Sequence, residues 1–138
     1  MVDSGGPRMI KDQVLDEKVF AINRALLKQY ADASGDQNPI HQDEAFAKSV
    51  GLPDVIAHGM LTMALAGKYV SDIAGGAAKV LEFGARFTKP VVVPAGQDVD
   101  LTLSATVTDV ADGKVSLSLS ATSAGVKVLG MAKAVITL

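Results

Sequence analysis

The stretch MLTMALAGKYV, residues 60–70, is apolar on almost every side when it is drawn as a helix. A helix with so little polar surface has to be buried on most of its sides. Its small residues Ala64, Ala66 and Gly67 allow other parts of the chain to approach closely. In a chain of 138 residues, such a helix can be buried only if a curved sheet wraps around it. The sequence therefore predicts an α+β fold with one central helix.

After this helix, apolar and polar side chains alternate, which is typical of strands with one buried face. We expect strands at residues 81–88, 98–108, 115–122 and 126–137. Asp112-Gly113 is a strong signal for a tight hairpin turn. The Gly-rich residues 71–78 are expected to form a loop. The predicted sheet is an antiparallel meander with one apolar face.

Two shorter helices are predicted before the apolar one. Apolar residues recur at helical spacing in residues 21–33, and Gly35, just beyond them, is a usual helix stop. Residues 36–41 cannot continue this helix, because Pro39 keeps the residue before it out of the helical region. We therefore predict a turn held by Asp and Asn side chains at 36–41, and a short helix at 43–50.

Composition favours one globular domain. Apolar residues make up 49% of the chain and charged residues 20%, and the net charge of −2 gives no basic stripe for nucleic acid or anionic lipid. The chain has no cysteine, which excludes disulfides and thiolate chemistry. We predict a flexible arm at residues 1–9, a short strand within 10–20, and a single domain over 10–138. No apolar leader or membrane-length segment is visible, so a cytoplasmic protein is expected.

Both histidines lie in residues 30–63, YADASGDQNPIHQDEAFAKSVGLPDVIAHGMLTM, the segment richest in candidate chemistry. The predicted turn brings Asp36 and His41 toward each other, and two such titratable groups suit acid–base catalysis. Asn38, between them, can hold a water molecule or orient the imidazole. Gly59, where the apolar helix begins, can present a bare N–H to an oxygen that gains negative charge.

These residues also have structural interpretations. Asp36 and Asn38 are common turn formers, and His41 could cap the next short helix. His58 is expected to fix the loop before the apolar helix. His41, Asp43 and His58 have the composition of a two-histidine, one-carboxylate iron site. An acidic residue is expected at a helix start in any case, so we predict no metal site.

Several motifs resemble those of the MaoC-like (R)-specific enoyl thioester hydratases and dehydratases. They are Tyr30, Ser34-Gly35-Asp36, Asn38-Pro39-Ile40-His41, Ala57-His58-Gly59-Met60-Leu61, Arg86-Phe87, Pro90-Val91 and Gly96. The resemblance extends over most of the chain and implies the hot-dog fold, a long helix wrapped by an antiparallel sheet. In length and detail the chain most resembles the catalytic β subunits of mycobacterial hydroxyacyl carrier-protein dehydratases. Many (R)-hydratases of the family carry a supporting serine where this chain, like those β subunits, has Gly67.

The resemblance implies a hydro-lyase that interconverts trans-2-enoyl and (3R)-hydroxyacyl thioesters of coenzyme A or acyl carrier protein in fatty-acid metabolism, without a cofactor. It implies that in dehydration His41 takes the α-proton and Asp36 protonates the departing hydroxyl, while the N–H of Gly59 holds the thioester oxygen. An acyl thioesterase of the same fold and a non-catalytic acyl-binding subunit of a heteromeric dehydratase are the alternatives. A homodimer, or a heterodimer with a related hot-dog subunit, is expected, with no nucleic-acid or membrane partner.

Overall fold

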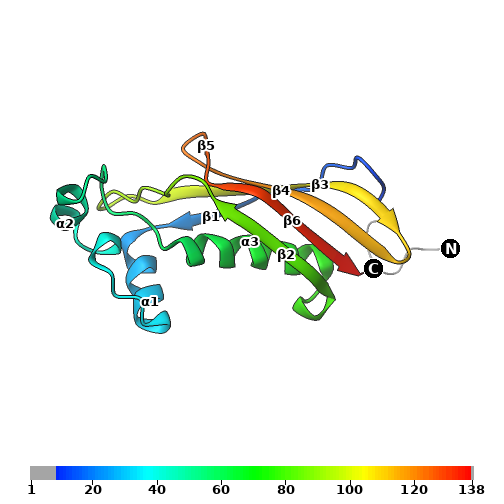
Figure 1. Ribbon diagram of the computed structural model, residues 1–138, viewed down its shortest axis with the longest axis horizontal. Coiled ribbons are helices and arrows are strands. Elements are labelled where there is room, and N and C mark those ends of the chain that lie inside the picture. The colour runs from blue at the N-terminus through cyan, green and yellow to red at the C-terminus, as the bar shows by residue number, and fades with distance from the viewer. Residues whose placement is uncertain (1–8, 138) are drawn as a thin grey trace.

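The computed structural model describes residues 9–137, so the predicted arm lies outside the described residues except for Met9. One antiparallel sheet curves around helix α3, Gly59–Ala74, which lies along its concave side (Figure 1). Helices α1, Arg24–Ser34, and α2, Glu44–Ser49, lie together beyond one end of the sheet. This is the α+β hot-dog architecture that the sequence predicted.

Helix α3 is buried as its composition requires, and it is longer than predicted. Leu61, Ala66 and Val70 are among its buried residues. The predicted loop at 71–78 is wrong for its first half, because Ile73 and Ala74 pack against the core and extend the helix to Gly75, which ends it in the left-handed region at φ 83°. Among the described residues, no helix is both long and apolar enough to span a membrane.

The sheet contains six strands in the order β1-β3-β4-β6-β2, with β5 paired to β4. Their bounds are β1 Lys18–Ile22, β2 Val80–Phe87, β3 Val99–Ala111, β4 Lys114–Ser123, β5 Val126–Lys127 and β6 Leu129–Thr137. The predicted simple meander is wrong for β2, which pairs with β6 at the far edge instead of with β3. Residues 88–98, which contain two prolines, carry the chain from one edge of the sheet toward the other.

The hairpin prediction is confirmed, since Asp112 and Gly113 both have positive φ, at 56° and 73°. The single strand predicted at 126–137 is instead divided at Val128 into β5 and β6. The division arises because β5 continues only the turn after β4, whereas β6 bends away to pair with both β4 and β2.

The boundary between the first strand and the first helix lies later than predicted. Ile22 is fully buried and ends β1, and the Asn23 side chain accepts a hydrogen bond from the N–H of Leu26. This cap places the start of α1 at Arg24. Gly35 ends the helix as predicted, in the left-handed region at φ 81°.

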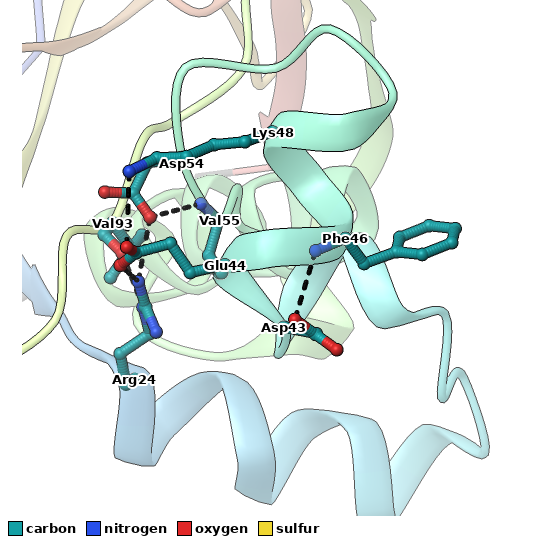
Figure 2. Close-up of polar contacts among 8 residues, drawn as sticks. All are labelled: Arg24, Asp43, Glu44, Phe46, Lys48, Asp54, Val55 and Val93. Carbon is teal, nitrogen blue, oxygen red and sulfur yellow. Dashed lines mark hydrogen bonds and ion pairs between the residues drawn. The ribbon is translucent and has the colours of Figure 1, made fainter.

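Arg24 joins the two short helices to the segment that leads to α3 (Figure 2). Its guanidinium donates to the carbonyl oxygen of Val93 at 2.6 Å, to Asp54 at 2.9 Å and to Glu44 at 3.4 Å. Asp54 in turn accepts from the N–H of Val55 at 2.7 Å. These bonds hold residues 54–57 beside residues 91–93, where the N–H of Val93 donates to the carbonyl of Val55.

Candidate functional site

The predicted turn at residues 36–41 is confirmed. A side-chain oxygen of Asp36 accepts from the N–H of Asn38, and that of Asn38 accepts from the N–H of Ile40, both at 3.2 Å. Residues Pro39–His41 then form a short 3-10 helix. The cap of α2 is the carboxylate of Asp43, which accepts from the N–H of Phe46 at 3.1 Å (Figure 2), so His41 is free of the capping role considered for it.

The His41 imidazole is held in one orientation by the chain before α3. The ring is 7% exposed, and its Nδ1 lies 2.7 Å from the carbonyl oxygen of Ile56. A carbonyl can only accept, so Nδ1 carries a proton, and in the neutral ring Nε2 is the nitrogen with the free lone pair. That Nε2 lies 4.0 Å from a carboxylate oxygen of Asp36, whose side chain is half exposed. The gap is too long for a hydrogen bond, so a substrate oxygen or water molecule beside both atoms can contact each.

His58 stacks on the His41 ring and is more deeply buried than His41. Its ring is 1% exposed, stacks on the His41 ring at a centroid distance of 3.9 Å, and lies 4.8 Å from the Tyr30 ring. Its Nε2 donates to the backbone carbonyl of Asp36 at 3.1 Å. Burial lowers the pKa of His58, and the bond to the Asp36 carbonyl opposes this only in part, so the ring is uncharged at neutral pH.

A cavity of about 330 Å³ opens beside His41. It is lined by His41, Ile56, Ala57, Gly59, Thr62, Phe87, Thr88, Lys89, Pro90, Val91 and Val128. Gly59 is the first residue of α3, where N–H groups have no acceptor within the helix. A Cβ on Gly59 would lie 3.2 Å from the Phe87 ring, so only glycine leaves this part of the cavity open. The cavity thus joins the His41 imidazole, a helix amino end and an apolar wall.

The structure brings some of the predicted site residues together more closely than others. His41 and Gly59 line the same cavity, whereas Asp36 is near His41 but is not among the lining residues within the described range. Asn38 is exposed and its side chain shapes the turn, so its role in holding water or the imidazole stays a prediction. At Gly67 a Cβ would face the Phe83 ring at 3.6 Å, so this glycine lies beside an aromatic ring.

Two contributors were missed by sequence reasoning. The Ile56 carbonyl that orients His41 is a backbone group, and a backbone group has no signature in the sequence. Thr62 is 4% exposed and lines the cavity one helical turn after Gly59. A hydroxyl in so apolar a helix was a signal that could have identified it.

The residues considered for a metal site do not gather as that hypothesis required. Asp43 caps α2, and the ligand atoms that do approach one another, within 4.8 Å, belong to Asp36, His41 and His58. The two imidazole rings are stacked at an interplanar angle of 24°. One nitrogen of each ring already contacts a backbone carbonyl: Nδ1 of His41 contacts that of Ile56, and Nε2 of His58 contacts that of Asp36.

The sequence pattern of the family described as the MaoC-like domain matches residues 7–126, which is most of the chain. The chain belongs to the MaoC-like domain family. Among solved structures, this MaoC-like domain is similar to a protein described as a MaoC-like dehydratase, with a TM-score of 0.91 and 32% identity over 94% of this chain and 41% of that one. It is also similar to the (R)-hydratase PhaJ1 of Pseudomonas aeruginosa, with a TM-score of 0.80 and 29% identity over 94% and 81% of the two chains.

Two proteins of Mycobacterium tuberculosis are similar in sequence. The 3-hydroxyacyl-thioester dehydratase X is 40% identical over 77 residues, which cover 56% of this chain and 26% of that protein. The 3-hydroxyacyl-thioester dehydratase Y is 48% identical over 61 residues, which cover 42% of this chain and 21% of that protein. The match therefore spans about a quarter of the length of these dehydratases.

Proposed function

We propose that this MaoC-like domain is a hydro-lyase that interconverts trans-2-enoyl and (3R)-hydroxyacyl thioesters. The observation that carries the proposal is that His41, whose Nδ1 is bound to the Ile56 carbonyl, and Gly59, the first residue of α3, line one cavity with an apolar wall. Thioester chemistry of this kind needs a base beside the reacting carbons and a donor for the carbonyl oxygen. The names of the similar dehydratases and of the (R)-hydratase support the same reaction.

In the dehydration direction, His41 Nε2 takes the α-proton, and the electrons of that C–H bond move toward the thioester carbonyl. The oxygen that gains this charge is held by the N–H of Gly59, at the positive end of α3. Such a donor typically contributes about 3 kcal/mol to the transition state. The enolate then forms the double bond as the C–O bond breaks, and the 3-hydroxyl leaves as water with the proton that Asp36, in its carboxylic acid form, carries at the start of the cycle. Transfer of the proton from His41 to Asp36, directly or through water, restores both groups.

The proposal also includes the metabolic setting of this reaction and the assembly of the protein. Fatty-acid metabolism supplies both forms of the substrate, on coenzyme A or on acyl carrier protein, and no step requires a cofactor. The kinship with the mycobacterial β subunits is part of this proposal. The proposal also includes a dimer, which is either a homodimer or a heterodimer with a related hot-dog subunit. Sedimentation of the purified chain tests the oligomer, and a stable monomer would contradict it.

The test of the reaction is hydration of crotonyl-coenzyme A and longer enoyl thioesters, on both carriers, followed by loss of the absorbance of the conjugated thioester. Asp36→Asn and His41→Ala should each lower kcat by about 10²- to 10⁴-fold, the range for removal of a general acid or base. Asp43→Asn is the matched control, because Asn caps a helix as well as Asp and Asp43 lies outside the cavity lining.

Three results would overturn the proposal. Full hydratase activity in the Asp36→Asn, His41→Ala double variant would remove the site assignment. Release of free thiol without hydration would identify an acyl thioesterase. An inactive chain that becomes active only with a second subunit, and whose Asp36 and His41 variants leave that activity unchanged, would identify a non-catalytic acyl-binding subunit.

A further inference from the structure

We propose that His58 is a positioning residue, which fixes the backbone of Asp36 against the start of α3 and so sets the distance between the acid–base pair and the Gly59 amide. This inference rests on the proposed function. It assigns a role to a buried titratable side chain that the reaction itself leaves unused.

The first observation is the bond from His58 Nε2 to the carbonyl oxygen of Asp36, 3.1 Å long, between residues 22 apart in the sequence. Among side-chain hydrogen bonds of the described residues, this one joins the turn that carries Asp36 directly to the N-cap of α3. Gly59 follows His58 at once. A single side chain therefore links the two halves of the site.

The second observation is that His58 is enclosed. The ring is 1% exposed, and its Nδ1 has no hydrogen-bond partner among residues 9–137. A buried acceptor without a partner destabilises the folded chain. Because His58 is not among the residues that line the cavity within the described range, this nitrogen has no access to substrate. Two contacts of the same side chain offset this loss: the hydrogen bond from Nε2 to the Asp36 carbonyl and the stack of the ring on His41.

The third observation is the stack on His41. The rings lie 3.9 Å apart at 24°, so His58 supports one face of His41 while the Ile56 carbonyl holds its edge. Both contacts oppose rotation of the His41 ring. A displacement of about 1 Å in a catalytic group can lower a rate by about 10²-fold, so both contacts bear on kcat.

The test separates the hydrogen bond from the ring. His58→Gln keeps an N–H donor at the reach of Nε2, and His58→Phe keeps a ring for the stack but loses the donor. If the bond to Asp36 positions the pair, His58→Phe should lower kcat by about 10- to 100-fold, and His58→Gln should recover most of that loss. KM should stay within about twofold in both variants, because His58 does not touch the cavity.

His58→Asn covers the case in which His58→Phe fails to fold. Its shorter amide is chemically the same as that of His58→Gln but cannot reach the Asp36 carbonyl. Thermal unfolding identifies which variants are folded. A kcat for the Gln variant about tenfold above that of the Asn variant supports the inference. Equal kcat in the two, or an unchanged kcat in folded His58→Phe, overturns it.

A measurement without substrate tests the geometry separately. In ¹H–¹⁵N spectra of the wild-type imidazoles, His58 should carry its proton on Nε2 and exchange it slowly with water. A proton on Nδ1, or rapid exchange, overturns the inference. A wild-type chain without hydratase activity rejects the proposed function instead, whereas an active wild type with unaffected His58 variants rejects only the positioning role.

Discussion

Replacement of Gly59 by Ala tests the amide at the start of α3 without removing any functional side chain. The new Cβ would lie 3.2 Å from two atoms of the Phe87 ring, closer than the usual 3.5–4.0 Å carbon contact, so the ring has to move by a few tenths of an ångström. Phe87 is 54% exposed and can make this movement at small cost. In the proposed mechanism, the methyl group would stand beside the N–H of residue 59, where the thioester oxygen is expected to bind.

The expected magnitudes for stability and activity differ. Gly59 has no positive φ, so Ala fits its backbone, and the free energy of unfolding should change by less than about 1 kcal/mol. Loss of one oxyanion donor costs about 3 kcal/mol in the transition state, equivalent to a fall of about 100-fold in kcat/KM. Crotonyl-coenzyme A hydration and thermal unfolding measure the two quantities on the same preparation.

Gly67→Ala is the matched control on the same helix. Its Cβ would meet the Phe83 ring at an ordinary 3.6 Å, and Gly67 lies outside the cavity lining. Ala inside a helix is favoured over Gly by about 1 kcal/mol, so this variant should melt about 3–5 °C higher with unchanged activity. Normal kcat/KM in a well-folded Gly59→Ala variant would refute the role of the amide. An equal loss in both variants would point to the helix as a whole.

Three further predictions concern stability. Arg24→Met should lower the free energy of unfolding by about 2 kcal/mol, because Asp54, whose side chain is only 17% exposed, loses its charged partner; an unchanged urea midpoint would contradict this. Tyr69→Phe should cost about 1 kcal/mol through loss of the 2.7 Å bond to the Asp16 carbonyl, measured in the same titration. Since the pKa of His58 is below its unfolded value of 6.5, the unfolded chain binds protons first as pH falls, so stability should decline below about pH 6.5. His58→Gln should weaken that decline, and an identical pH profile of Tm would contradict the argument.

Local patterns predicted the elements whose causes are local. The apolar surface of residues 60–70 required burial whatever surrounds it, and the structure buries it. Asp112-Gly113 formed the expected hairpin because both residues tolerate positive φ. Gly35 ended α1 for the same reason. The turn at 36–41 followed from a proline and from Asp and Asn side chains that bond to their own backbone.

Elements that depend on distant contacts were predicted poorly. The alternation in 81–88 shows a strand but not its partner, so the pairing of β2 with β6 could not be read from it. The helix extends to Ala74 because side chains of its last turn find a core to pack against. In both cases the deciding contact lies far away in the sequence.

The candidate site divides in the same way. The sequence alone identified Asp36, His41 and Gly59 as candidates, from their residue types and from the family resemblance of the motifs around them. Which nitrogen of His41 donates a hydrogen bond was decided by the Ile56 carbonyl, and the contact on the face of its ring was decided by His58. The sequence gives the identity of each side chain, whereas the position of a proton and the orientation of a ring depend on neighbours that only the folded chain brings to distances of 2.7, 3.1 and 3.9 Å.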